Sequence, residues 1–248
     1  MDEAKRIIED GEKEGITLRL MGGCAIRAHC SKFRYLLDGM KRELPDIDIM
    51  SYSKLSPHVK RFFTKLGYTP DEEVLAYYAF FKGGRHIYYD KERKITVDVL
   101  FDTLSMCHEI DFRGRLELDY PTISLADILL HKMQIVELNK RDVIDTIVLL
   151  REHNVGEKDK EVINAKYIGS ILSKDWGFYH TVTTNLSEVK KFLGQYDILT
   201  TEDCSDINNK IDELLVELEK EPKTLKWRMR EKIGTRMKWY QEVEEVKR

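Results

Sequence analysis

Two aspartates alternate with isoleucines in the segment Asp46-Ile47-Asp48-Ile49, and this alternation constrains the fold of the chain more than any other feature. In an extended strand successive side chains point to opposite faces, so the aspartates share one face while the isoleucines enter the core. Neighbouring carboxylates repel each other unless a cation lies between them. Mg²⁺ suits such a place because it binds one or two protein carboxylates together with substrate phosphates. Phosphoryl or nucleotidyl transfer is therefore the first hypothesis.

A third acid and a pair of glycines extend this pattern. Asp98 lies in a second strand-like run, Thr-Val-Asp-Val-Leu at residues 96–100. Gly22 and Gly23 follow a predicted strand at residues 16–21 and open a predicted helix that continues to His29. A helix that begins directly after a strand offers backbone N–H groups to a phosphate, and glycine lets that phosphate approach closely.

Composition narrows the classes of protein that remain. The 248 residues suffice for one large or two modest domains, and a formal net charge of -3 indicates no general attraction to nucleic acid. No apolar run approaches the roughly 20 residues of a membrane span, so a cytoplasmic protein without membrane partners is expected. The four cysteines have no paired CxxC spacing, which indicates reduced thiols and neither a zinc site nor a disulfide framework.

The periodicity of apolar residues predicts an α+β protein, with an α/β domain at residues 1–120 and a helical domain at residues 121–248. The first part is predicted to hold a small β-sheet flanked by helices. Its expected helices cover residues 2–14, 22–29 and 54–66, and its expected strands cover residues 16–21, 46–49, 75–81, 86–89 and 94–101. The expected helices of the second part cover residues 124–136, 141–153, 159–172, 186–195, 205–220 and 224–246.

The order of these motifs resembles a known superfamily. Gly22-Gly23-Cys-Ala, then Arg42 four residues before Asp46-x-Asp48, then the Asp98 strand, are similar to the motifs of the DNA polymerase beta-like nucleotidyltransferases. Within that superfamily the chain most resembles the AbiEii/AbiGii abortive-infection toxin type. Two later segments add to the likeness, Ala126 to Lys132 and the Arg-Asp-x-x-Asp run at residues 141–145. The resemblance spans roughly residues 16–150.

The resemblance implies a nucleotidyltransferase fold with a mixed sheet, and transfer of a nucleoside monophosphate from a triphosphate such as ATP to an acceptor hydroxyl. It implies that Asp46, Asp48 and Asp98 are catalytic and hold Mg²⁺ or Mn²⁺, with Gly22, Gly23, Arg42 and Lys132 binding the nucleotide. A toxin of this type implies tRNA or protein as acceptor and an antitoxin as partner. Two alternatives stay open, a small-molecule nucleotidyltransferase of the antibiotic-modifying kind and a non-catalytic nucleotide-binding module.

Several of these residues also have simpler interpretations. Lys132 can be a solvated lysine on an amphipathic helix, and Arg141 can form an i,i+4 surface ion pair with Asp145. Arg42 can contact phosphate or neutralise Asp46, and His29 is interpreted as a packed residue. Basic and aromatic residues interleave at residues 223–240, where an amphipathic helix that buries its tryptophans is favoured over an RNA-binding face.

Overall fold

The computed structural model describes residues 1–78 and 84–243, and the chain divides into two compact units. The first, called the sheet unit here, comprises residues 1–29, 43–104 and 110–124. The second, the helical unit, comprises residues 30–42, 105–109 and 125–248. Two short segments of the first half thus belong to the helical unit. The first of them carries helix α3 (Arg34–Gly39), which packs on helix α7 (Lys140–Glu152).

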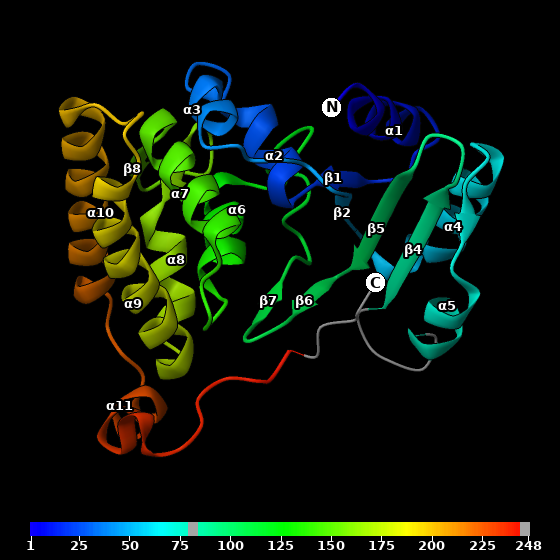
Figure 1. Ribbon diagram of the computed structural model, residues 1–248. Coiled ribbons are helices and arrows are strands. Elements are labelled where there is room, and N and C mark those ends of the chain that lie inside the picture. Colours follow the sequence, from blue (N-terminus) through cyan, green and yellow to red (C-terminus); the bar gives the residue numbers. More distant parts are fainter. Residues whose placement is uncertain (79–83, 244–248) are drawn as a thin grey trace. The chain divides into compact units, whose positions relative to one another are not determined.

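A five-stranded mixed sheet forms the centre of the sheet unit (Figure 1). Its strands, in spatial order, are β1 (Leu18–Leu20), β2 (Ile47–Ser51), β5 (Ile95–Phe101), β4 (Arg85–Asp90) and β3 (Thr69–Pro70). The β2–β5 pair is parallel, and every other neighbouring pair is antiparallel. The apolar residues that alternate with the acids in β2 and β5 are buried, as the sequence pattern predicts.

Helices flank this sheet, as expected for the α+β class. They are α1 (Asp2–Lys13), α2 (Gly22–His29), α4 (Ser56–Lys65) and α5 (Glu72–Tyr78), with the 3₁₀ turn η1 (Ser53–Leu55) before α4. Helix α1 buries Ala4, Ile7, Ile8 and Gly11, which are spaced to form one stripe facing strand β1. Acidic residues begin this helix and Lys13 ends it, in the order that the helix dipole favours.

The strand predicted at residues 75–81 is wrong where the structure describes it, because residues 72–78 form helix α5. The Asp71 carboxylate accepts a hydrogen bond from the Val74 backbone N–H, and Glu72 and Glu73 occupy the first turn. These helix-start signals outweigh the strand propensity of the valine and tyrosines that follow. Residues 79–81 of the prediction lie outside the described residues.

The helical unit is built mainly from helices that pack side by side (Figure 1). Besides α3 and α7 they are α6 (Leu125–Met133), α8 (Ala165–Leu172), α9 (Trp176–Phe192), α10 (Thr201–Lys220) and α11 (Leu225–Ile233), with 3₁₀ turns η2 (Leu193–Gln195) and η3 (Gly234–Arg236). Short strands β8 (Asn154–Gly156) and β9 (Val162–Asn164) of this unit pair in parallel. Strand β6 (Thr103–Ser105) pairs with β7 (Glu109–Asp111), and most residues of these two strands belong to the sheet unit. No helix of the described residues is long and apolar enough to cross a membrane.

Several helix boundaries in this unit differ from the sequence prediction. Helix α8 begins at Ala165 rather than near residue 159, because residues 162–164 form strand β9 and the Asn164 side chain caps the helix. Helix α9 begins at Trp176 rather than near residue 186, because the Asp175 side chain caps it by accepting from the Phe178 backbone N–H. Helix α11 ends at Ile233 rather than near residue 246, since Gly234 takes a φ of 62° at its C-terminal cap. Residues 244–246 of that prediction lie outside the described part of the chain.

The first turn of α10 provides a test of local stability. The Thr200 hydroxyl accepts from the Asp203 backbone N–H, and the Asp203 carboxylate accepts in return from the Thr200 backbone N–H at 2.9 Å. Thr200→Ala removes this cap and is expected to lower the free energy of unfolding by about 1 kcal/mol. Urea titration followed by circular dichroism measures the loss. Ser205→Ala, at an exposed interior position of the same helix, is the control and should leave stability nearly unchanged.

Candidate active site

Asp48 and Asp98 occupy directly opposed positions on the parallel strands β2 and β5. Opposed residues of neighbouring strands point to the same face of a sheet, and the strands lie about 4.8 Å apart. Asp98 is 3% exposed, and Asp48 is partly exposed. The register therefore brings two of the three predicted acids together on one face of the sheet.

The turn between β1 and α2 lies against Asp48. The Met21 backbone N–H donates to the Asp48 carbonyl oxygen at 2.9 Å, and the next residue, Gly22, has a φ of 59°. A Cβ atom at Gly22 would overlap the Asp48 carboxylate oxygen and lie 3.2 Å from its Cγ. Glycine is thus required at position 22 for two reasons: the backbone is left-handed there, and the Asp48 carboxylate leaves no room for a Cβ atom. Gly23 follows as a buried residue in the first turn of α2.

Asp46 lies in a bend directly before β2 rather than inside the strand. Strand alternation consequently does not by itself fix the direction of its side chain. The Asp46 carbonyl oxygen lies 3.7 Å from the Cys24 sulfur on α2, so the backbone at this point is held against the same helix that begins at Gly22. Asp46 is partly exposed.

Arg85, at the start of β4, contacts Asp98 through its guanidinium group. Its Nε lies 2.9 Å from Oδ1 and 3.1 Å from Oδ2 of Asp98, and its Nη2 also donates to Oδ2. The hydrogen bonds to Asp98 raise the pKa of Arg85 and outweigh the opposing effect of burial. The sequence pattern identified the strand at residues 86–89 but left Arg85 out of it. Arg85 is recognised as a neighbour of Asp98 only from the β4–β5 register. That register places Ile87 opposite Asp98, and Arg85 lies two residues before Ile87.

The fit of a metal to these residues follows from their donor atoms and contacts. Within residues 1–78 and 84–243, no three His, Cys, Asp or Glu side chains are grouped so as to hold a metal ion. Asp48 and Asp98 nevertheless supply the hard carboxylate oxygens that Mg²⁺ prefers, and Mg²⁺ takes only one or two carboxylates when substrate phosphates complete its shell. The Asp48 carboxylate also lies directly against the Gly22 turn, because it occupies the place that a Cβ would take there. The acid pair therefore fits Mg²⁺ in donor type and number.

The other two predicted nucleotide-binding residues, Arg42 and Lys132, meet in the helical unit around Asp145. Arg42 makes a two-pronged contact with Asp145, with Nε–Oδ1 at 2.9 Å and Nη2–Oδ2 at 2.8 Å. Lys132 Nζ, on α6, lies 2.8 Å from Asp145 Oδ2 and 3.0 Å from Asp142 Oδ1. Arg42, Lys132 and the two acids of α7 thus form one buried set, called the Asp145 cluster here.

Opposite charges balance in the Asp145 cluster, and they shift its pKa values. Burial disfavours the charged form of Lys132, but the Asp145 and Asp142 carboxylates outweigh it and raise the pKa of the lysine. Burial likewise opposes ionisation of Asp145, yet Lys132 and Arg42 lower its pKa below the ordinary 3.8. The predicted ion pair between Arg141 and Asp145 is wrong, because Arg141 is exposed while Asp145 points into the protein.

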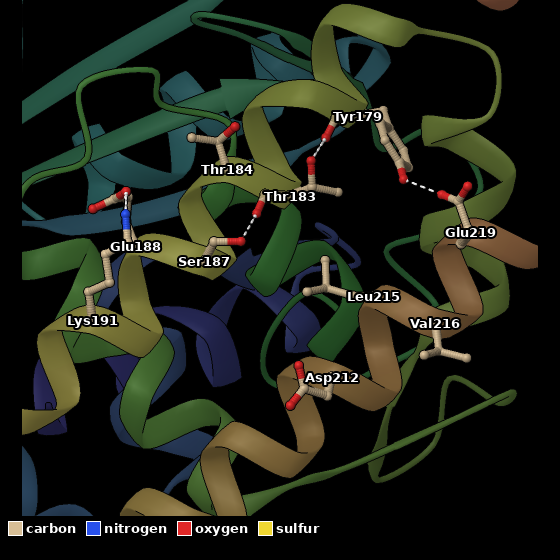
Figure 2. Close-up of a pocket in the computed structure, with 10 residues that line it drawn as sticks. All are labelled: Tyr179, Thr183, Thr184, Ser187, Glu188, Lys191, Asp212, Leu215, Val216 and Glu219. Atoms are coloured by element: carbon tan, nitrogen blue, oxygen red, sulfur yellow. Dashed lines mark hydrogen bonds and ion pairs between the residues drawn. The ribbon is translucent and has the colours of Figure 1, made fainter.

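A groove in the helical unit lies between α9 and α10 (Figure 2). Its hydroxyl groups are largely engaged by their own helix, since Thr183 donates to the Tyr179 carbonyl and Ser187 to the Thr183 carbonyl. Glu219 accepts from the Tyr179 hydroxyl at 2.6 Å, and Asp212 pairs with Lys190. The groove contains none of the sequence-predicted site residues, and its polar groups are those of two packed surface helices.

The remaining candidates of the sequence are packed residues. His29 contacts the Thr122 hydroxyl and lies 3.3 Å from the Asp119 carboxylate. Trp227 on α11 is buried and meets Tyr179 edge to face at 5.3 Å, while Trp239 Nε1 donates to the Thr181 hydroxyl at 3.1 Å. The aromatic residues near the C-terminus thus anchor this segment to α9.

No protein-family model matches the chain, and no curated protein matches its sequence. The arrangement of the residues is accordingly the basis for any functional inference. It gives an acid pair with an adjoining glycine turn and arginine in the sheet unit, and a charge-balanced cluster in the helical unit.

A pair of glycine variants separates the two roles of Gly22. Gly15 also has a left-handed φ, 71°, but a Cβ there meets nothing within 4 Å. Gly15→Ala should therefore cost only the backbone strain, roughly 1–2 kcal/mol. Gly22→Ala should cost more and should also weaken Mn²⁺ binding, because the methyl group displaces the Asp48 carboxylate. Chemical denaturation and Mn²⁺ titration measure the two effects, and equal behaviour of both variants would contradict the close approach to Asp48.

Asp145→Asn tests the Asp145 cluster. The change leaves Arg42 and Lys132 buried without their shared carboxylate and should lower stability at pH 7 by roughly 3–5 kcal/mol. Asp142→Asn is the matched control, since the Asp142 side chain is 12% exposed against 1% for Asp145, and a smaller loss is expected. Because the folded pKa of Asp145 is lowered, its stabilising contribution is present above the ordinary 3.8 and is lost as pH falls through the lower folded value. The difference between the parent and Asp145→Asn should accordingly shrink only below about pH 4 in denaturant titrations.

Proposed function

We propose that the chain is a Mg²⁺-dependent nucleotidyltransferase that moves a nucleoside monophosphate from a nucleoside triphosphate to an acceptor hydroxyl. The observation that supports this most is the side-by-side placement of Asp48 and Asp98 on parallel strands, with the Gly22 turn directly against Asp48. A carboxylate pair next to a helix N-terminus combines the two needs of phosphoryl transfer, oxygen ligands for a cation and N–H groups for an anion.

Each residue has a definite part in this proposal. Asp48 and Asp98 would hold the metal, with Asp46 as a further ligand, and Asp98 also accepts or orients the proton of the attacking hydroxyl. The backbone N–H groups after Gly22 bind a phosphate of the triphosphate, without any side-chain hydroxyl at this point of the turn. Mg²⁺, when bound, supplies positive charge to the attacking and leaving oxygens of the transferred phosphoryl group. Pyrophosphate leaves as the second product.

The contacts of Arg42 and Lys132 bear on their proposed nucleotide-binding role. Both side chains are buried and ion-paired within the Asp145 cluster. A direct contact with a triphosphate requires that they exchange a carboxylate partner for a phosphate oxygen.

The acceptor is proposed to be a hydroxyl of tRNA or protein, as in the toxin type that the sequence resembles, and a small-molecule acceptor is the alternative within the same chemistry. A non-catalytic nucleotide-binding module is the second candidate function. The Arg85 contact with Asp98 favours that second candidate, because the guanidinium group occupies carboxylate oxygens that would otherwise accept a hydrogen bond from the attacking hydroxyl.

Two isosteric variants distinguish the enzyme from the binding module. Incubation with each α-labelled triphosphate, Mg²⁺ or Mn²⁺, and separate pools of tRNA, protein and small molecules should transfer label to one pool. Asp48→Asn should abolish transfer, because it removes a metal-ligand charge, and Asp98→Asn should remove turnover while retaining much of the triphosphate binding. Asp111→Asn, an exposed acid paired with Arg113, is the control and should transfer normally. A parent protein that binds triphosphate without transferring label, and an Asp98→Asn variant that behaves identically, would establish the binding module.

A further inference from the structure

Arg85 reaches Asp98 diagonally across two antiparallel strands. Asp98 is opposite Ile87 in the β4–β5 pair, and Arg85 shares the face of Ile87 because it lies two residues earlier in β4. Diagonal neighbours of this kind lie about 7–8 Å apart, within reach of a long side chain. The arginine thus approaches Asp98 from the β4 side, whereas Asp48 lies on the β2 side.

Both carboxylate oxygens of Asp98 accept hydrogen bonds from Arg85. The Asp98 side chain is 5% exposed and that of Arg85 is 22% exposed, so the pair is largely shielded from water. A divalent cation binds carboxylate oxygens directly, at about 2.0–2.1 Å for Mg²⁺, whereas the Arg85 guanidinium group already donates twice to Oδ2 and once to Oδ1 and carries a positive charge that repels the cation. Arg85 and a metal ion are therefore competing partners for Asp98.

The pair has a second electrostatic effect, on Asp48. Two carboxylates in opposed positions of neighbouring strands repel each other. A guanidinium group at Asp98 offsets part of that repulsion in the metal-free protein. Arg85 accordingly stabilises the folded protein when no metal ion is bound, which is the state in which the repulsion between the two carboxylates is greatest.

We propose that Arg85 is the built-in counter-cation of the acid pair, and that it regulates the proposed site by competing with the divalent cation for Asp98. Metal binding releases at least one Asp98 oxygen from the guanidinium group, so the affinity for metal is set below that of the bare acid pair. This inference rests on the proposed function insofar as Asp48 and Asp98 are its metal ligands. It adds a residue that limits metal affinity and thereby sets the metal concentration at which the site forms.

Metal binding without nucleotide tests the proposal independently of turnover. Mn²⁺ is titrated into the full chain, with free Mn²⁺ followed by electron paramagnetic resonance, for the parent, Arg85→Met and Arg85→Lys. Arg85→Met should bind Mn²⁺ roughly tenfold or more tightly than the parent, the size of effect expected when a charged hydrogen-bonded partner is removed. Arg85→Lys, which keeps the charge but loses the two-pronged contact, should lie between them.

Thermal unfolding supplies the second measurement. Without metal, Arg85→Met should melt below the parent, and Mn²⁺ should raise its melting temperature by more than it raises that of the parent. Arg93→Met is the matched control, because Arg93 is a more exposed arginine of the same unit that pairs with Asp90 and Glu3. It should bind Mn²⁺ like the parent. Should Arg85→Met be too unstable to titrate, the order of Arg85→Lys and the parent in Mn²⁺ affinity decides the question.

Each outcome bears on the proposal in a definite way. Equal or weaker Mn²⁺ binding by both Arg85 variants would overturn it and leave Arg85 as a purely structural partner of Asp98. If Asp48→Asn loses Mn²⁺ binding at the same time, the metal site and the proposed function stand and only the role of Arg85 fails. If neither the parent nor any Arg85 variant binds Mn²⁺, both the counter-cation role and the metal-dependent function are wrong.

Discussion

The opposed placement of Asp48 and Asp98 on two parallel strands is the constraint on which the sheet unit depends. A parallel pair cannot be closed by a short turn, so the chain must make a long crossover between the end of β2 and the start of β5. That crossover contains α4, β3, α5 and β4, and therefore also Arg85. On the β1 side of β2, the residue at position 22 in the β1–α2 turn must be glycine, because the Asp48 carboxylate occupies the place of a Cβ. The placement of this one pair of acids thus accounts for the glycine at the β1–α2 turn and for the long crossover that contains Arg85.

The Asp145 cluster and the group formed by Asp48, Asp98 and Arg85 differ in their arrangement of charges. In the Asp145 cluster, two cations face two carboxylates, and every member is buried or nearly so. Such a set is internally neutral, and breaking it leaves a buried charge without compensation. Asp48 and Asp98, by contrast, are two carboxylates placed side by side, and Arg85 contacts the second of them. A neutral buried set is suited to holding helices together, whereas a carboxylate pair beside a helix N-terminus is suited to a cation and its phosphate ligands.

Much of the fold could be predicted from local patterns, because those patterns depend on neighbours within one element. Alternation identified β2 and β5, and the glycine pair marked the start of α2. The helix α5 was missed because the tyrosines and valine of residues 74–78 favour strands, while the start signal lies earlier, at Asp71. The partners of Asp145 were also missed. Arg42 lies 103 residues away from it in sequence, and spacing alone favoured the nearby Arg141.

The same distinction explains why Asp98 was found and Arg85 was not. Alternation states which face a side chain occupies, but only the register of two strands states which side chains are neighbours. A one-residue slip of β5 against β2 would set Val97 or Val99 opposite Asp48 and turn Asp98 to the other face. The buried valines on either side of Asp98 resist that slip, because it would exchange them with a charged group. The apolar residues that stabilise the sheet therefore also fix the register of β2 and β5, and this register places Asp98 opposite Asp48.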